Sequence, residues 1–374
     1  MSMSNQRRIL VTGVAGFIGK NLLVRLGEQS NTEVLSFVRG DSDELLTAMV
    51  ASADAIVHLA GENRPDDVAD FARVNTELTR TLCESIRLNG RNIPLILASS
   101  TQAQCENPYG ISKLAAEHIV ESFVAETGNS AVIYRLPGVF GKWCKPYYNS
   151  VVATFCHNIA RGLPIQVNDA SVTLQLAYID DVVDELLRVL DDSKFDLLRG
   201  KINPIYDISL GALAEQITAF KNCRTNLISE RVGTGIVRAL YSTYISYLPS
   251  EQFTYNLPQY GDERGIFVEM LKTPDCGQFS FFTVHPGITR GSHYHHSKTE
   301  KFLVVRGLAR MRFRHIITGE IIDITVSSDK SQVVDSIPGW VHDITNIGDS
   351  EAIIMLWANE IFDRQRPDCI PCEV

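Results

Sequence analysis

The chain has 374 residues, of which 45% are hydrophobic and 21% are charged, and its formal net charge is -9. This is the composition of a globular protein with enough apolar material for two domains, and its acidity disfavours a nucleic-acid partner. The N-terminal segment lacks the apolar stretch of a signal peptide, and no apolar run approaches the ~18 residues that span a bilayer. We therefore expect a cytoplasmic protein without a membrane partner, whose eight cysteines are reduced.

Short apolar runs alternate with helical patterns through residues 7–190. Strands are predicted at residues 8–11, 33–38, 54–59, 95–98 and 131–135, and the first helix is predicted at residues 16–28. Strands that alternate with helices indicate an α/β fold of the Rossmann type, with a doubly wound parallel sheet.

A glycine-rich turn joins the first predicted strand to the first helix. Its spacing is GxxGxxG, and the residues that we expect to bind a cofactor here are Gly13, Gly16, Phe17, Ile18 and Gly19. Glycines permit a tight turn and a close approach of the backbone to a pyrophosphate, and the N–H groups of the helix start attract its charge. The turn therefore predicts a dinucleotide site; the alternative is a plain tight turn.

The second predicted strand ends at Arg39. Enzymes that use NAD usually place an acidic residue there, which binds the ribose 2′-hydroxyl, whereas an arginine can pair with a 2′-phosphate. Arg39 therefore favours NADPH as the cofactor. The alternative is that Arg39 is a solvated cation at the end of a strand.

A YxxxK pattern places Tyr109 and Lys113 on one face of a predicted helix. A nearby ammonium lowers the pKa of a tyrosine, which can then pass a proton to a carbonyl oxygen as a hydride reaches the carbon. Ser100, at the end of the preceding strand, is predicted to orient the substrate, with Thr101 as the second choice. Ser100, Tyr109 and Lys113 are thus the predicted catalytic residues.

The pattern changes near residue 250, after a predicted linker at residues 221–252. Beyond it, short β-rich runs are separated by Gly, Pro, Asn and Asp, which is typical of an antiparallel barrel or jelly roll. We therefore expect a first domain at residues 1–248 and an all-β second domain at residues 249–374.

In the second half, His293, His295 and Glu300, and later His342, have spacing that resembles the two motifs of the cupin family, and they form a candidate metal site. His293 and His295 are two residues apart on a predicted strand, so both side chains point to the same face. Three histidines and a glutamate can bind one divalent metal and leave coordination positions open. The alternative is a set of polar barrel residues that binds no metal.

The motifs of the two halves, with residues 140–146, 242–250 and 300–305, resemble one enzyme family. In this family an extended short-chain dehydrogenase/reductase is fused to a cupin, and its members are bifunctional nucleotide-sugar enzymes of capsular polysaccharide and O-antigen synthesis. The resemblance implies a UDP-linked 4-keto-6-deoxy amino sugar as substrate. The cupin would epimerise C3 of a UDP-2-acetamido-2,6-dideoxy-4-hexulose, and the reductase would reduce C4 with NADPH. The product would be a UDP-2-acetamido-2,6-dideoxy-L-talose, a precursor of UDP-N-acetyl-L-fucosamine.

The resemblance also implies zinc as the metal, a homodimer formed through the cupin, and several contact residues. His58, Leu59 and Ala60 would pass beneath the cofactor, and Asn75 would contact the catalytic region. Sugar or diphosphate contacts would come from Lys142, Lys145 and Asn149.

Residues 262–269 and 290–294 resemble the metal-free deoxysugar 3,5-epimerases instead. This second resemblance implies that Arg264, Glu269 and Lys301 contact the substrate and gives His293 an alternative role as a base. Two further interpretations stay open. The cupin could serve only for sugar sensing or dimerisation, and the first domain could be a non-enzymatic NADPH sensor.

Overall fold

The computed structural model describes residues 6–192, 198–258, 260–262, 265–267, 271, 277–360, 365 and 367–374. Two residues predicted to contact substrate, Arg264 and Glu269, lie outside the described residues. The chain divides into two compact units. The first comprises residues 1–150 and 174–207, and the second comprises residues 151–173 and 208–374.

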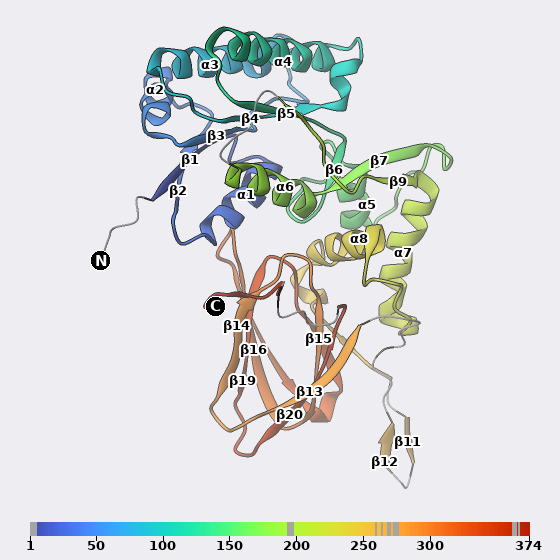
Figure 1. The fold of residues 1–374 in the computed structure, drawn as a ribbon. Helices are drawn as coiled ribbons and strands as arrows, with labels where there is room; N and C mark the ends of the chain where they lie inside the picture. Colours follow the sequence, from blue (N-terminus) through green and yellow to red (C-terminus); the bar gives the residue numbers. More distant parts are fainter. Residues whose placement is uncertain are drawn as a thin grey trace, which may run out of the picture. The chain divides into compact units, whose positions relative to one another are not determined.

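The first unit is built on a parallel sheet, as predicted (Figure 1). Its described strands follow the order β2-β1-β3-β4-β5-β8, and every pairing between them is parallel. The strands are β1 (Arg7–Thr12), β2 (Thr32–Phe37), β3 (Ala55–His58), β4 (Leu95–Ser100), β5 (Ala131–Leu136) and β8 (Leu198–Gly200). The order reverses at β1 and β3, which is the point where a doubly wound sheet binds its ligand.

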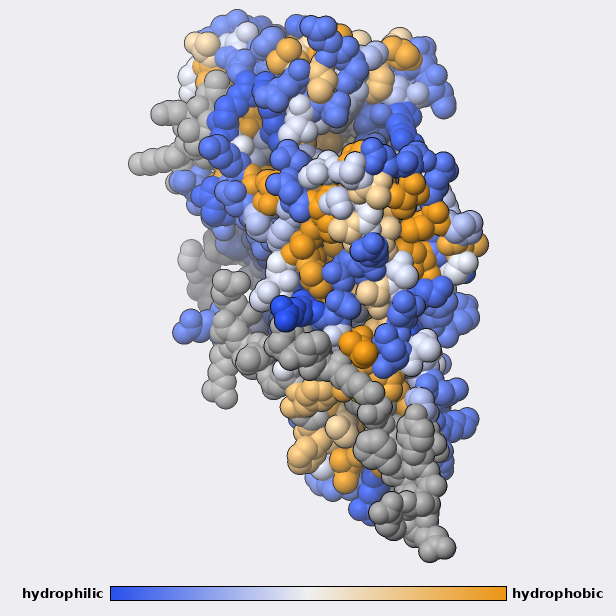
Figure 2. All heavy atoms as spheres, turned by 90° about the vertical axis from the view of Figure 1, so that its right-hand side faces the viewer, coloured by the Kyte–Doolittle hydropathy of each residue, from blue (hydrophilic) through white to orange (hydrophobic). Residues whose placement is uncertain are grey.

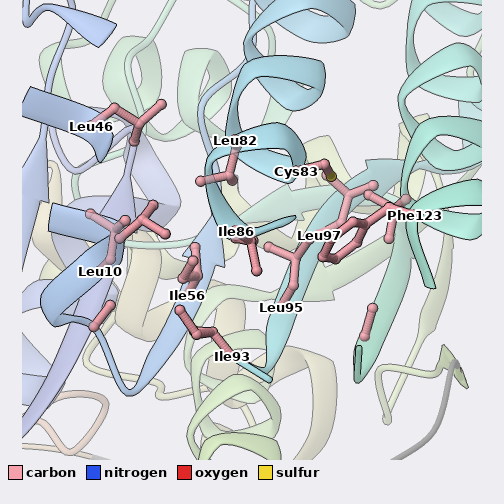
Figure 3. Close-up of a cluster of buried hydrophobic side chains, with 14 of the residues drawn as sticks. Leu10, Leu46, Ile56, Leu82, Cys83, Ile86, Ile93, Leu95, Leu97 and Phe123 are labelled. Atoms are coloured by element: carbon pink, nitrogen blue, oxygen red, sulfur yellow. The ribbon is translucent and has the colours of Figure 1, made fainter. Parts of the chain in front are cut away.

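Helices cover this sheet because its strands are apolar on both faces. The helices are α1 (Phe17–Gly27), α2 (Asp43–Ser52), α3 (Leu78–Asn89), α4 (Pro108–Thr127) and α6 (Ile179–Asp191), with the short segments η1 (Phe71–Glu77) and η2 (Thr101–Gln104). Figure 3 shows the core on one face, where Leu10, Ile56 and Leu97 of the strands pack with Leu82 of α3 and Phe123 of α4. A smaller sheet contains β6 (Gly138–Phe140), β7 (Thr173–Tyr178) and β9 (Tyr206–Ser209).

The second unit contains a β-sandwich whose described strands form two five-stranded antiparallel sheets. One sheet has the order β10-β18-β15-β20-β13 and the other β17-β16-β19-β14-β21. This is the cupin-type barrel expected from the sequence. Its strands are β10 (Thr254–Asn256), β13 (Gln278–Val284), β14 (Thr289–Tyr294), β15 (Glu300–Arg306), β16 (Leu308–His315), β17 (Ile321–Ser327), β18 (Gln332–Asp335), β19 (Trp340–Asn346), β20 (Ala352–Ala358) and β21 (Ile370–Pro371). Outside these sheets, β11 (Tyr260–Asp262) pairs with β12 (Gly265–Phe267), and η3 (Ser250–Gln252) and η4 (Ser328–Lys330) are single turns.

Three helices belong to the second unit, and they correct the expected linker at residues 221–252. They are α5 (Val151–Arg161), α7 (Leu210–Asn226) and α8 (Gly235–Ser246). Tyr241 and Tyr244 of α8 are 2% and 1% exposed, and their rings lie 5.1 and 6.1 Å from that of Phe220 on α7. This burial stabilises the segment as packed helix, so the compact units do not divide at residue 248.

Large exposed hydrophobic side chains are dispersed over both units. Val68 and Leu88 are 62% and 70% exposed in the first unit, and Phe281 and Ile321 are 70% and 64% exposed in the second. Figure 2 shows hydrophobic residues in small patches among hydrophilic ones on the face that it draws. Among the described residues, no helix combines the length and the apolar character needed to cross a bilayer.

Candidate active sites

The glycine turn of the first unit is packed too tightly for side chains. Gly13 has a φ of +74°, and a Cβ added to it would lie 2.7 Å from the backbone nitrogen of Ala60. A Cβ on Gly19 would lie 2.3 Å from the carbonyl oxygen of Gly13. Gly16 makes the N-cap of α1 without a side-chain cap, so the first N–H groups of the helix stay available to a ligand. Phe17 and Ile18 form the first turn of this helix.

His58 anchors the loop that faces this turn. Its Nδ1 lies 2.6 Å from the hydroxyl of Thr12, and its Nε2 lies 3.0 Å from the hydroxyl of Thr79. Burial, and then the nearby Lys113 ammonium, lower the pKa of His58 to about 3. The imidazole is therefore neutral and structural, while Leu59 and Ala60 beyond it remain partly exposed.

The three predicted catalytic side chains come from the end of β4 and the start of α4. Helix α4 begins sharply because the Asn107 side chain accepts a hydrogen bond from the Gly110 N–H and Pro108 occupies the first turn. Tyr109 therefore lies in the first turn and Lys113 in the next. The Ser100 side chain is hydrogen-bonded to that of Tyr109. The Lys113 ammonium donates to the carbonyl of Ala98 over 3.0 Å.

Burial governs the pKa values in this site. It lowers the pKa of Lys113 to about 8, although the Glu117 carboxylate favours the ammonium. It raises the pKa of Tyr109, against the effect of the Ser100 hydrogen bond. From the sequence, Lys113 was expected to lower the pKa of Tyr109. In this structure the phenol stays protonated at neutral pH and is ready to donate its proton.

Asn75 and Glu62 connect the catalytic helix with the loop after β3. The Asn75 Nδ2 donates to the hydroxyl of Ser112 and to the carbonyl of Glu62, both over 2.9 Å. Its Oδ1 accepts the N–H of Glu62 over 2.8 Å. Asn75 is 2% exposed, and these bonds make it a brace of the catalytic region. It lies in η1, a π-helical turn, a feature often found at functional sites.

Arg39 is paired with Glu62, a residue that sequence reasoning missed. The guanidinium lies 2.7 Å from the Glu62 carboxylate, whose other oxygen accepts the hydroxyl of Tyr148 over 2.9 Å. The Arg39 side chain is 81% exposed and Glu62 12%. The sequence could have indicated Glu62, because this residue directly follows the predicted cofactor segment His58-Leu59-Ala60-Gly61.

Of the predicted sugar or diphosphate contacts, Lys142 has a structural partner. Its ammonium lies 2.6 Å from the Asp180 carboxylate, and its side chain is 2% exposed. Lys145 and Asn149 are exposed in the loop that follows β6. The first unit thus brings together the glycine turn, residues 58–60 and the Ser100, Tyr109 and Lys113 set around the carboxyl ends of the strands.

The four predicted metal ligands meet inside the β-sandwich of the second unit. The candidate ligand atoms of His293, His295, Glu300 and His342 all lie within 4.8 Å of one another. The Glu300 carboxylate is 3.1 Å from Nε2 of His295 and 3.4 Å from Nε2 of His342. Tetrahedral ligands at ~2.0–2.1 Å from zinc lie ~3.3–3.4 Å apart, which is close to the two distances from Glu300.

The electrostatics of this cluster also fit a cation. Burial and the neighbouring imidazoles lower the pKa of His293 to about 4 and also lower that of His342. Burial opposes ionisation of Glu300, but His295 and His342 hold its pKa well below the ordinary value. Neutral histidines and an ionised glutamate are the ligand forms that metals need. Neither ring nitrogen of His342 makes a well-formed hydrogen bond among the described residues, although the side chain is buried and Nε2 lies 3.4 Å from the Glu300 carboxylate.

A pocket of about 340 Å³ opens onto this cluster. His293, Glu300 and His342 line it together with aromatic and aliphatic side chains and with Arg290. The Arg290 guanidinium stacks 5.3 Å from the ring of Phe282. Arg290 belongs to a predicted motif, residues 290–294, but had no predicted role. Because it lines this pocket, its guanidinium is available to an anionic ligand.

Lys301 lies outside this pocket, which corrects its predicted contact with substrate. Adjacent residues of a strand point to opposite faces, so Lys301 faces away from Glu300 on β15. It is 1% exposed, and its ammonium lies 2.7 Å from the Asp335 carboxylate and 3.3 Å from the Tyr255 hydroxyl. Burial disfavours the ammonium, but Asp335 raises the pKa of Lys301 well above its ordinary value. Lys301 is thus a fixed structural cation.

Family models match both halves of the chain. Residues 9–203 match the NAD dependent epimerase/dehydratase family, and residues 260–370 match the polysaccharide biosynthesis C-terminal domain. Together these matches reproduce the order of the two folds.

Individual relatives extend over nearly the whole chain. The chain is 52% identical over 367 residues to the UDP-2-acetamido-2,6-beta-L-arabino-hexul-4-ose reductase of Pseudomonas aeruginosa, covering 98% of this chain and 99% of that protein. The GDP-6-deoxy-D-mannose reductase of the same species is 26% identical over 237 residues, which cover 55% and 75% of the two chains. The crystal structure of the capsular polysaccharide assembling protein CapF from Staphylococcus aureus matches with a TM-score of 0.67 and 42% identity, over 98% and 100% of the chains.

Proposed function

We propose that this chain, which belongs to the NAD dependent epimerase/dehydratase family, is a bifunctional enzyme acting on a UDP-linked 4-keto-6-deoxy amino sugar. The domain built on the parallel sheet would reduce the C4 ketone with NADPH, and the β-sandwich would epimerise C3. The observation that carries the reductase is the Ser100, Tyr109 and Lys113 set, together with a glycine turn that has no room for a Cβ at Gly13 or Gly19. The 52% identity to a UDP-sugar 4-keto reductase supports the substrate class.

In the reduction, a bound dihydronicotinamide supplies the hydride for C4. The Tyr109 hydroxyl donates a proton to the ketone oxygen as the hydride arrives, and Ser100 binds the same oxygen and orients it. Lys113, held by the Ala98 carbonyl, lies on the same helix face, where its ammonium would bind the cofactor. Arg39 would bind the 2′-phosphate of NADPH, in exchange for its present pairing with Glu62.

In the epimerisation, His293, His295, Glu300 and His342 would hold one divalent metal, which we propose is zinc. Such an ion supplies Lewis acidity, which acidifies the C3 proton beside the C4 ketone. Arg290 lines the same pocket and would bind an anionic part of the substrate. His293 is the least buried of the four and so is also placed to accept a proton in a metal-free reaction.

The two reactions share the C4 ketone, so one substrate can serve both units. Epimerisation at C3 and reduction at C4 would convert a UDP-2-acetamido-2,6-dideoxy-4-hexulose into a UDP-2-acetamido-2,6-dideoxy-L-talose, a precursor of UDP-N-acetyl-L-fucosamine. We further propose that the enzyme works in the cytoplasm as a homodimer formed through the cupin.

The direct test incubates the purified chain with NADPH and UDP-2-acetamido-2,6-dideoxy-β-L-arabino-4-hexulose in heavy water. Absorbance follows NADPH, and NMR follows the proton at C3. We expect one NADPH consumed per substrate and deuterium at C3 of the product. Consumption of NADPH without deuterium at C3 would assign the cupin to sugar binding or dimerisation, and no consumption would contradict the reductase.

A further inference from the structure

The C-terminal residues of the chain lie beside β14, the strand that carries His293 and ends directly before His295. Strand β21 pairs antiparallel with β14, with Pro371 opposite His293 and Ile370 opposite Tyr294. The N–H of Cys372 donates to the carbonyl of Ser292 over 2.9 Å. Figure 1 shows the C-terminus next to β14.

Asp368, just before β21, binds the segment that connects His295 with Glu300. Its carboxylate accepts the N–H groups of His296, Ser297 and Lys298 over 2.8, 2.7 and 2.7 Å. It also accepts the Ser297 hydroxyl over 3.1 Å. Successive N–H groups that converge on one carboxylate form an anion-binding nest. The carboxylate thus fixes the backbone conformation of this segment.

This segment depends on side chains because it is buried without a full set of sheet hydrogen bonds. Residues 296–300 are all less than 8% exposed, and buried N–H groups require partners. The next two N–H groups bind the Asn359 side chain over 3.0 Å and the Ser336 hydroxyl over 2.8 Å. Asp368 therefore accepts hydrogen bonds from three of the five successive N–H groups of residues 296–300, a segment that ends at Glu300.

The backbone of Asp368 acts on His295 itself. The Nδ1–H of His295 donates to the carbonyl oxygen of Asp368. A donor at Nδ1 leaves the lone pair on Nε2, the nitrogen that lies 3.1 Å from Glu300. Metal-bound histidines commonly have their tautomer and ring orientation set by such a second hydrogen bond.

We infer that Asp368 is a positioning residue of the metal site, which orients His295 through its carbonyl and Glu300 through its carboxylate. The inference rests on the proposed metal binding. A residue that served only to attach the C-terminal tail would stabilise the metal-free and metal-bound proteins equally. A positioning residue instead changes the affinity for the metal.

The test uses the full-length chain, stripped of metal, and its Asp368→Asn variant. Asparagine keeps the size of the side chain but loses one acceptor oxygen and the charge. Zinc affinity is measured by competition with a chromophoric chelator, and Co²⁺ absorption reports the ligand geometry. We expect the variant to bind Zn²⁺ ~10–100-fold more weakly, which is typical of losing a residue that orients a ligand, and to show altered Co²⁺ bands.

Glu373→Gln is the matched control, because it removes one negative charge from the same tail at an exposed position. It should bind Zn²⁺ as the parent does. Equal Zn²⁺ affinity of the parent and Asp368→Asn, with a lower Tm for the metal-free variant, would overturn the inference and leave a structural anchor. A parent protein that binds no Zn²⁺ would instead overturn the proposed metal site itself, and the positioning role with it.

A measurement on the parent covers the case in which Asp368→Asn does not fold. With ¹⁵N-labelled histidine, NMR should show His295 protonated at Nδ1 with Zn²⁺ bound at Nε2. The opposite arrangement, a proton on Nε2 and Zn²⁺ at Nδ1, would contradict the inference without any substitution.

Discussion

The two candidate sites differ in how completely their buried polar side chains are hydrogen-bonded. In the first unit, His58 and Asn75 are hydrogen-bonded through both of their polar side-chain atoms to partners within the unit. In the second, His342 is buried and its ring nitrogens make no well-formed hydrogen bond among the described residues, with Nε2 at a long 3.4 Å from the Glu300 carboxylate. An unsatisfied buried group costs ~1–3 kcal/mol, so it is expected to have a partner in the working protein.

This difference indicates how each site is completed. In the first site, buried polar side chains near the glycine turn are already hydrogen-bonded, so a ligand adds contacts to groups that have partners. The second is a set of donors that converge on one point, and its ligand supplies the missing partner. The first site should therefore tolerate removal of its ligand better than the second.

The largest effect is expected from Tyr109→Phe, which removes the proposed proton donor. Loss of one general acid typically costs ~10²–10⁴-fold in rate, so NADPH consumption should fall by that factor. Exchange of the C3 proton for deuterium should persist, because the cluster of the second unit is unchanged. Absorbance and NMR on one sample measure both. Tyr206→Phe, on β9 away from the catalytic set, is the matched control, and simultaneous loss of both reactions would show that one site performs them.

Removing His342 should affect the second unit alone. Without this ligand, His342→Ala should bind metal more weakly, by more than the ~10–100-fold expected for a residue that only orients a ligand. Elemental analysis after dialysis measures the occupancy, which we expect at about one divalent ion per chain in the parent. His285→Ala, whose side chain is 79% exposed, is the control. A metal-free parent with full C3 exchange activity would refute the metal role and favour His293 as the base.

Much of this arrangement could be predicted from the sequence, because it depends on local spacing. The glycine turn, the YxxxK helix and the His293 and His295 pair each follow from the period of one strand or helix. The Glu300 and His342 partners needed a family resemblance, since they come from other strands. The order of the two folds also followed from the change in pattern near residue 250.

One error lay in strand alternation, and the other features that were missed depend on packing between distant segments. Lys301 was predicted to contact substrate, yet its neighbour Glu300 occupies the inward-facing position, and strand alternation alone would have shown the conflict. The helix at residues 235–246 was mistaken for linker because Tyr241 and Tyr244 are buried only through partners such as Phe220. Asp368 lies far along the chain from His295, so no spacing could indicate its role.

The buried, neutral His58 should make the stability of the first unit sensitive to acid. An unfolded chain protonates His58 near pH 6.5, whereas the folded chain does so only near its lowered pKa of about 3. The unfolded state therefore binds more protons between these values, and the free energy of unfolding falls as pH drops below 6.5, by up to ~1.4 kcal/mol per pH unit. Urea unfolding from pH 7 to pH 4 should show this slope, and His58→Gln should flatten it. Equal slopes in parent and variant would assign the acid sensitivity to other groups.

The smallest effect concerns the Arg39 and Glu62 ion pair, whose guanidinium is exposed to solvent. If Arg39 binds the 2′-phosphate, then Glu62 competes for the same guanidinium, and Glu62→Gln should strengthen NADPH binding. Exposed ion pairs contribute ~0.2–1 kcal/mol, so the gain should be only ~1.4- to ~5-fold. NADH lacks the phosphate and should bind unchanged.

Arg39→Ala should act in the opposite direction and reduce the preference for NADPH. Fluorescence titration of each protein with both cofactors gives the dissociation constants, and Glu33→Gln, which removes an exposed carboxylate from β2, is the control. Because the competition is electrostatic, the gain from Glu62→Gln should shrink as the salt concentration rises. Equal affinities of the parent for NADPH and NADH would contradict the role of Arg39, and a Glu62→Gln variant that gains for both cofactors would show that the carboxylate acts on the loop of Tyr148 and Asn75 instead.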